Sequence, residues 1–176
     1  EAEVENLHFW SWGYGYLYTV KTSLWVDGKK VDEVSTRTGF RKTRFADGKI
    51  WLNDRVLQMK GFAQRTSNEW PGVGMSIPAW LSDYSNGMMV EGNANLVRWM
   101  HICPWKQDIE SCDRVGLIQA MPAGDAEKDR QGRQWEQRTE LMRDAIIYNR
   151  NNPSIIFYEC GNESISKEHM LEMKAI

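Results

Sequence analysis

The sequence predicts an α/β chain in which antiparallel β-structure is followed by a parallel sheet with helices. Residues 7 to about 56 contain short alternating segments separated by Asx-Gly turns, which is typical of antiparallel sheets. After about residue 56, strand-like and helix-like segments alternate four times. Such alternation indicates a parallel sheet whose strands are joined by helices.

The amino-terminal part contains three turn signals. Asp27-Gly28 divides one alternating stretch, Asp47-Gly48 divides a second, and Asn53-Asp54 follows shortly after. Asp-Gly and related pairs accept the positive φ angles that tight hairpins need. We therefore expect antiparallel hairpins of the kind found in β-sandwiches.

Two helices are predicted in the middle of the chain. The first has Pro78 near its start and Gly92 as its stop. The second places Trp105, Ile109 and Cys112 on one face and ends at Gly116. Trp99 and Trp105 could stack on sugar rings, but we expect both to pack in the core, which is the commoner role of tryptophan.

The predicted strands of the second half are short apolar runs, and two more helices accompany them. The strands lie in VLQMKGFA, ANLVRWM, GLIQAM and SIIFYEC. Continuous apolar runs of this length are typical of parallel strands buried on both faces. A third helix ends before Pro153, and a fourth begins after Ser166, a suitable N-cap.

Composition excludes several functions. The formal charge is −2 with acids and bases interspersed, which argues against nucleic acid or a membrane surface as partner. No apolar run is long enough to span a bilayer. Cys103, Cys112 and Cys160 lack CxxC spacing, so we expect three buried thiols and neither a disulfide framework nor a zinc site. The compartment stays open, with a periplasmic or secreted location favoured over a cytoplasmic one.

Six ordered segments resemble one family, glycoside hydrolase family 2, which contains β-galactosidases, β-glucuronidases and β-mannosidases. They are FWSWGYGYLYTV, TGFRKTRF, WLNDRVLQMKGF, NANLVRWMHICPW, SCDRVGL and NRNNPSIIFYECGNES. The first departs from the family pattern because Gly15 stands where proline is usual. Together the segments cover nearly the whole chain, so the resemblance does not depend on one motif.

The resemblance implies a fold class and a domain division. Residues 1–50 would be the carboxyl-terminal part of an immunoglobulin-like β-sandwich domain. Residues 51–176 would be the amino-terminal half of a (β/α)₈ TIM barrel, with four of its strands. The remainder of the barrel would then be missing from this chain, and the chain alone is expected to be inactive.

The resemblance also implies a chemistry for Asn162 and Glu163, at the end of the fourth barrel strand. Retaining glycosidases use two carboxyl groups about 5–5.5 Å apart, one as general acid/base and one as nucleophile. Glu163 would be the general acid/base, and Asn162 would bind the sugar 2-hydroxyl. The nucleophile would lie beyond this fragment. The alternative is that both residues only cap the next helix, which asparagine does well.

Three further residues complete the predicted site. By the resemblance, Arg98 braces the nucleophile and His101 contacts the sugar; their alternatives are a structural ion pair and a hydrogen-bonded loop histidine. Arg65 near the sugar could favour an anionic or sulfated glycan, or could be a surface arginine without substrate contact. Met121 and Pro122 stand where related β-galactosidases carry metal-binding acids, so we predict neither a metal nor another cofactor.

The predicted function is a retaining exo-β-glycosidase acting on terminal sugars of oligo- or polysaccharides. β-Galactosidase is the first expectation, and β-glucuronidase or β-mannosidase the next. The alternative from another class is a catalytically inactive carbohydrate-binding or interaction module of the same fold, which retention of Asn162 and Glu163 disfavours. An unrelated α/β domain is disfavoured by the ordered motifs.

Overall fold

A computed structural model describes residues 3–65, 70, 72–74, 77–122 and 128–176. Within these ranges, the carboxyl-terminal part is built on a parallel sheet with strand order β6-β7-β8-β9. Its strands are β6 (Gly61–Gln64), β7 (Leu96–Trp99), β8 (Ile118–Pro122) and β9 (Ile155–Glu159). The predicted four-stranded parallel sheet is therefore confirmed, and the order of strands around it follows the order along the chain, as at the start of a (β/α)₈ barrel.

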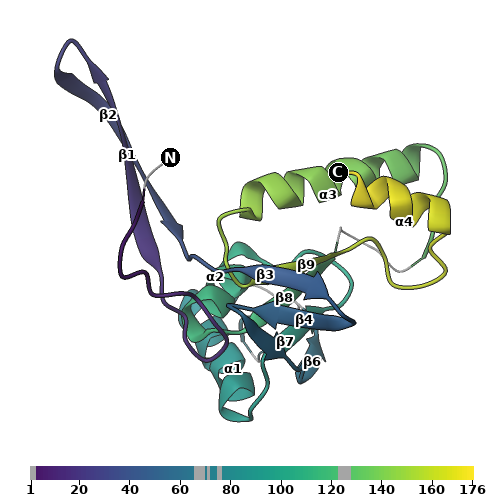
Figure 1. Cartoon of the computed structure of the whole chain (residues 1–176). Coiled ribbons are helices and arrows are strands. Elements are labelled where there is room, and N and C mark those ends of the chain that lie inside the picture. Colours follow the sequence, from purple (N-terminus) through teal and green to yellow (C-terminus); the bar gives the residue numbers. More distant parts are fainter. Residues whose placement is uncertain (1–2, 66–69, 71, 75–76, 123–127) are drawn as a thin grey trace.

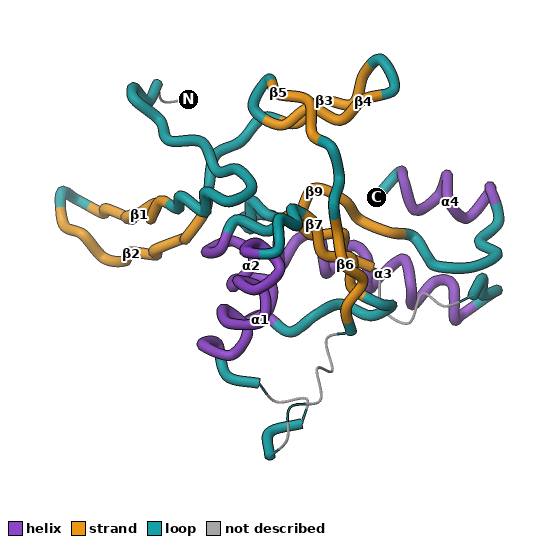
Figure 2. Tube along the Cα trace, turned by 90° about the horizontal axis from the view of Figure 1, so that it is seen from below, coloured by secondary structure: helices purple, strands orange, loops and turns teal. Residues whose placement is uncertain are grey.

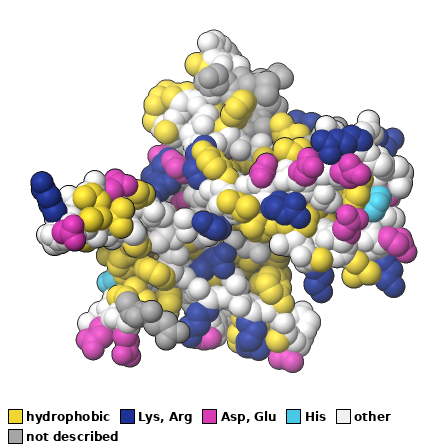
Figure 3. Space-filling model, turned by 90° about the horizontal axis from the view of Figure 1, so that it is seen from above, with side chains coloured by type: hydrophobic (Ala, Val, Ile, Leu, Met, Phe, Trp, Pro, Cys, Tyr) yellow, Lys and Arg dark blue, Asp and Glu magenta, His cyan; other side chains and the backbone are white. Residues whose placement is uncertain are grey.

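The amino-terminal part forms a long hairpin. Strands β1 (Tyr18–Val26) and β2 (Lys29–Thr38) pair in antiparallel register. The turn between them has φ of 48° at Asp27 and 75° at Gly28, as a type I′ turn requires. The hairpin projects away from the rest of the chain (Figure 1), and hydrophobic side chains lie exposed along it (Figure 3).

A three-stranded meander follows the hairpin. It consists of β3 (Thr43–Ala46), β4 (Lys49–Leu52) and β5 (Arg55–Leu57), and it forms a sheet separate from β1-β2. Leu52 and Leu57 pack in one cluster with Ile118, the first residue of β8. The meander therefore covers the amino-terminal end of the parallel strands and leaves the opposite end for a site, and Figure 2 shows it beside that sheet. The predicted domain division at residues 50 and 51 falls within β4 and stays a prediction.

The helices agree with the predicted start and stop signals. They are α1 (Ala79–Glu91), α2 (Lys106–Val115), α3 (Arg133–Asn149) and α4 (Lys167–Lys174). Gly116 ends α2 in the left-handed conformation, and the Ser166 hydroxyl caps α4 by accepting a hydrogen bond from the His169 amide at 3.3 Å. Both caps match residues that the sequence singled out.

The helix side of the parallel sheet carries much of the core. Trp99 is fully buried with Cys112 between β7 and the first two helices, as expected. The expectation for Trp105 was wrong: its side chain is 48% exposed, because it occupies the extended N-cap position of α2 and does not share the inward helix face. The expectation for Cys103 and Cys160 was also wrong, since both are only half-buried.

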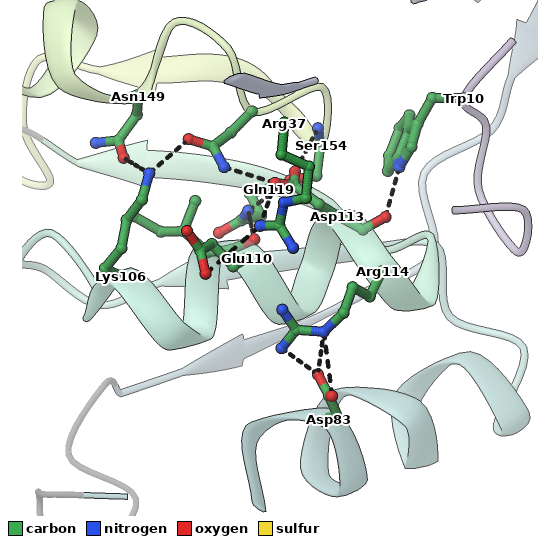
Figure 4. Close-up of polar contacts among 12 residues, drawn as sticks. Trp10, Arg37, Asp83, Lys106, Glu110, Asp113, Arg114, Gln119, Asn149 and Ser154 are labelled. Carbon is green, nitrogen blue, oxygen red and sulfur yellow. Dashed lines mark hydrogen bonds and ion pairs between the residues drawn. The ribbon is translucent and has the colours of Figure 1, made fainter. Parts of the chain in front are cut away.

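A buried polar network fixes the start of β9. The Asp113 carboxylate on α2 accepts hydrogen bonds from the Ser154 hydroxyl at 2.5 Å, the Ser154 amide at 3.2 Å and the Asn152 side chain at 2.5 Å. Figure 4 shows Ser154 and Arg37 converging on this carboxylate. From the amino-terminal part, Arg41 donates to the carbonyls of Pro153 and Ile155 at 2.5 and 2.6 Å. Arg41 and Asp113, which are far apart in the sequence, thus both hold the start of β9, the strand that leads to Glu163.

Candidate active site

The predicted site residues lie where the parallel strands end. Arg65 directly follows β6, Arg98 is the penultimate residue of β7, and His101 lies two residues beyond β7. Asn162 and Glu163 follow β9 by three and four residues. Because parallel strands point the same way, these segments belong to one edge of the sheet, opposite the meander, where barrel enzymes carry their active sites.

Arg98 joins two of the barrel strands at this edge. Its Nη2 donates a hydrogen bond to Oδ1 of Asn162 at 3.1 Å and another to Glu159 Oε2 at 2.8 Å. Its Nε lies 2.9 and 3.0 Å from the two Glu159 oxygens. The ion-pair alternative for Arg98 is therefore present in the structure, and the same guanidinium also contacts one of the predicted substrate-binding residues.

Glu163 is exposed and is carried on a loop that continues the sheet. Its backbone forms an isolated parallel bridge with Lys128, which lies in the connection after β8. The Lys128 carbonyl in turn accepts a hydrogen bond from Nη1 of Arg138 at 2.7 Å, and Arg138 is buried in α3. The backbone of Glu163 is thus tied to a neighbouring segment while its side chain remains open to solvent.

Asp129 holds the same loop from its other side. Its Oδ1 lies 2.6 Å from Nδ1 of His169, and its Oδ2 accepts a hydrogen bond from the Ser166 amide at 3.2 Å. The hydrogen bond with His169, followed by those from the Ser166 and Arg130 amides, holds the pKa of Asp129 below its ordinary value. The His169 ring stacks on Trp135 with centroids 3.8 Å apart. The loop that carries Glu163 is therefore anchored to both α3 and α4.

Arg65 and His101 are placed at the edge, but their substrate roles stay predictions. Arg65 is exposed, and His101 is half-buried after a cis Met100–His101 peptide bond. Thr66, which follows Arg65, lies outside the described residues, as do residues 123–127 in the connection after Pro122. Over the ranges that the structure describes, no group of three or more His, Cys, Asp or Glu side chains could hold a metal ion.

Sequence reasoning missed three residues of this region: Glu159, Asp129 and His169. Glu159 had a detectable signal, because it is an acid at the end of an otherwise apolar strand, two residues after Phe157 and so on the same face. Asp129 and His169 are 40 positions apart and carry no local pattern. Only the fold brings them together.

Comparison with known proteins identifies the family. The family model described as "Glycosyl hydrolases family 2" matches residues 1–41, and the model described as "Glycosyl hydrolases family 2, TIM barrel domain" matches residues 43–176. The second match covers most of the chain. This chain therefore belongs to glycoside hydrolase family 2, and its parallel sheet is the early part of a TIM barrel.

Similar proteins include enzymes of two named activities. A β-glucuronidase of Formosa agariphila is 30% identical over 98% of this chain, and a β-galactosidase of Psychromonas ingrahamii is 30% identical over 92% of it. A solved β-glucuronidase structure from glycoside hydrolase family 2 superposes with a TM-score of 0.88 at 30% identity, over 98% of this chain.

The match covers only a small part of these relatives. The chain spans 18% of the Formosa enzyme, 16% of the Psychromonas enzyme and 18% of the solved chain. Within its described residues, no helix has the length and hydropathy needed to cross a membrane.

Proposed function

We propose that this chain forms the acid/base half of the active site of a retaining, exo-acting β-glycosidase. The observation that carries the proposal is the hydrogen bond from Arg98 to Asn162, directly before Glu163, at the carboxyl-terminal edge of the parallel sheet. Family membership supports it. The alternative of Asn162 as a simple helix cap is disfavoured, because Ser166, four residues later, caps α4.

The placement of Glu163 supports the chemistry proposed for it. Its side chain is exposed at the strand ends, where it can reach the oxygen that links a sugar to its leaving group. In a retaining mechanism it donates a proton to that oxygen, and then removes a proton from the water that hydrolyses the glycosyl-enzyme. Asn162 contributes by binding the sugar 2-hydroxyl, a contact that strengthens in the transition state.

The second carboxyl group is proposed to come from a later barrel strand. A TIM barrel has eight strands, and the described parallel sheet supplies four. Residues 1–176 alone are therefore expected not to hydrolyse glycosides. Turnover by the isolated chain that disappears in Glu163→Gln would contradict this expectation.

Two substrate classes are proposed in order. β-Galactosides remain the first, as predicted from the sequence, and a similar Psychromonas protein bears the name β-galactosidase. β-Glucuronides are the second, and the exposed Arg65 after β6 favours them because a guanidinium pairs well with a carboxylate. Arg65→Gln should then lower kcat/KM for the aryl β-glucuronide by about tenfold, a loss of roughly 1.4 kcal/mol, and leave the aryl β-galactoside unchanged. An equal fall in kcat/KM for both substrates would show that Arg65 does not determine substrate specificity.

The test of the function uses a protein that carries residues 1–176 together with the rest of the barrel. Glu163→Gln should lower kcat on aryl glycosides with poor leaving groups by about 10²–10⁴-fold, because general acid catalysis is lost. Substrates with good leaving groups should be affected less in the first, glycosylation step. Glu140→Gln on α3, an exposed carboxylate paired with Arg133, is the matched control and should retain wild-type kcat. Wild-type rates in Glu163→Gln would refute the assignment.

A further inference from the structure

Glu159 is a carboxylate at the carboxyl-terminal edge of the sheet that the proposed chemistry does not use. It is the last residue of β9, and its side chain is only 18% exposed. Both of its oxygens face the guanidinium of Arg98, at 2.8 to 3.0 Å. This two-point contact fixes the plane of the guanidinium as well as its position.

Strand β8 lies between β7, which carries Arg98, and β9, which carries Glu159. Arg98 on β7 pairs in register with Ala120 on β8, and Glu159 pairs with Pro122. In a parallel sheet, register partners point to the same face, so Arg98, Ala120, Pro122 and Glu159 share one face and the contact between Arg98 and Glu159 passes above β8. Strands β7 and β9 lie about 10 Å apart, twice the usual spacing of neighbouring strands. The small side chain of Ala120 leaves this path open.

The contact has a consequence for Asn162. An arginine side chain has donors and no acceptor, so the group of Asn162 that lies 3.1 Å from Arg98 must be its carbonyl oxygen. The amide orientation is therefore set by chemistry. With Oδ1 engaged by Arg98, Nδ2 is the part of the amide that can donate to a sugar hydroxyl.

We propose that Glu159 is a positioning residue of this active site. It holds Arg98 by two oxygens, and Arg98 turns the amide of Asn162 so that Nδ2 faces the sugar 2-hydroxyl. The proposal rests on the proposed function, since it concerns the same sugar contact. A positioning role can be distinguished from a purely structural ion pair. Loss of a structural pair would not selectively affect recognition of the 2-hydroxyl.

The experiment compares an aryl β-glycoside with its 2-deoxy analogue, in the protein that carries the complete barrel. Glu159→Gln keeps the shape of the side chain and removes its charge. Ala120→Leu leaves Glu159 intact and fills the path above β8. Asn162→Ala removes the sugar contact itself, and Glu140→Gln removes an exposed ion pair on α3. Melting temperatures are recorded for each variant.

We expect Glu159→Gln and Ala120→Leu to lower kcat/KM for the parent glycoside by about 10- to 100-fold, since misplacement of a positioning group by about 1 Å costs this much. Both variants should lower kcat/KM for the 2-deoxy analogue far less. The preference for the 2-hydroxyl, measured as the ratio of kcat/KM for the parent glycoside to that for its 2-deoxy analogue, should therefore fall toward the value of Asn162→Ala. Glu140→Gln should keep both the rate and the preference of the wild type.

Two results would overturn the inference. One is a wild-type preference for the 2-hydroxyl in Glu159→Gln, when Asn162→Ala has lost it. The other is an equal fall for both substrates that accompanies a lower melting temperature, which would make the ion pair structural. Absence of turnover by the wild-type protein on any glycoside would instead refute the proposed function, so the two failures are distinguishable.

Discussion

Replacing Asp113 by alanine should destabilise the protein more than any surface charge change. Its carboxylate accepts three hydrogen bonds from Ser154 and Asn152, and Ser154 is fully buried. Leaving three donors unsatisfied at about 1–3 kcal/mol each gives a gross loss of roughly 3–9 kcal/mol. Burial raises the pKa of Asp113, which shows that its charge is costly to desolvate, and this cost disappears in the variant. We expect a net loss of about 3–5 kcal/mol.

Urea unfolding followed by tryptophan fluorescence measures this loss, and Asp83→Ala is the matched control. Asp83 also pairs with an α2 side chain, Arg114 at 2.7 Å, but both partners are about one-third exposed (Figure 4). Such a pair contributes about 0–1 kcal/mol. With a slope of about 2 kcal/mol per molar urea, Asp113→Ala should lower the midpoint by roughly 1.5–2.5 M and Asp83→Ala by less than about 0.5 M. Equal midpoints for the two variants would refute the role of the buried network.

Two further predictions concern backbone packing and pH. Gly15→Ala should destabilise by about 1–3 kcal/mol, because its Cβ would lie 2.1 Å from the Arg114 carbonyl oxygen. Gly87→Ala within α1 should stabilise by up to about 1 kcal/mol, because its Cβ would meet no atom within 4 Å apart from its chain neighbours and the backbone of its own helix. Urea midpoints check both, and a stabilising Gly15→Ala would contradict the packing. The lowered pKa of Asp129 means that its contribution to stability is complete above the ordinary value of 3.8 and is lost as pH falls through the lowered value. The difference in unfolding free energy between wild type and Asp129→Asn should therefore shrink below about pH 4. A difference that grows as the pH falls would contradict the assigned direction of the pKa shift.

The sequence predicted the elements of this fold well because their signals are local. The turns at Asp27-Gly28 and Asp47-Gly48 need positive φ, and the caps at Gly116 and Ser166 satisfy backbone groups within a few residues. The sequence did not reveal that the meander forms its own sheet at the amino-terminal end of the parallel strands. That placement depends on contacts such as Leu52 with Ile118, which are far apart in the chain.

The candidate site was predictable only in part. The sequence predicted that Asn162 and Arg98 lie at the carboxyl ends of parallel strands, and the roles assigned to them stay predictions. The structure brings the Asn162 side-chain oxygen within 3.1 Å of the guanidinium of Arg98. Its partner Glu159 was not found, because pairing across an intervening strand depends on register and on the small side chain of Ala120. The contact between Asp129 and His169 was not predicted either, because the two residues are 40 positions apart and only the fold brings them together.

Gly15 shows how a departure from a family pattern can have a local structural cause. This residue stands where proline is usual in the family, and its Cα faces the backbone of Arg114 so closely that no Cβ fits without displacement. Any residue with a Cβ, proline included, would collide with the Arg114 carbonyl at this position, which is a local reason for glycine here.

Chemical rescue of Glu163→Ala by azide tests the central claim most directly, in the protein that carries the complete barrel. Without an acid/base, an aryl glycoside with a good leaving group should still form the glycosyl-enzyme, which then reacts slowly with water. Azide needs no base, so it should restore turnover and yield a glycosyl azide with retained β-configuration. Undiminished hydrolysis by Glu163→Ala without azide, or an α-configured azide product, would contradict the account.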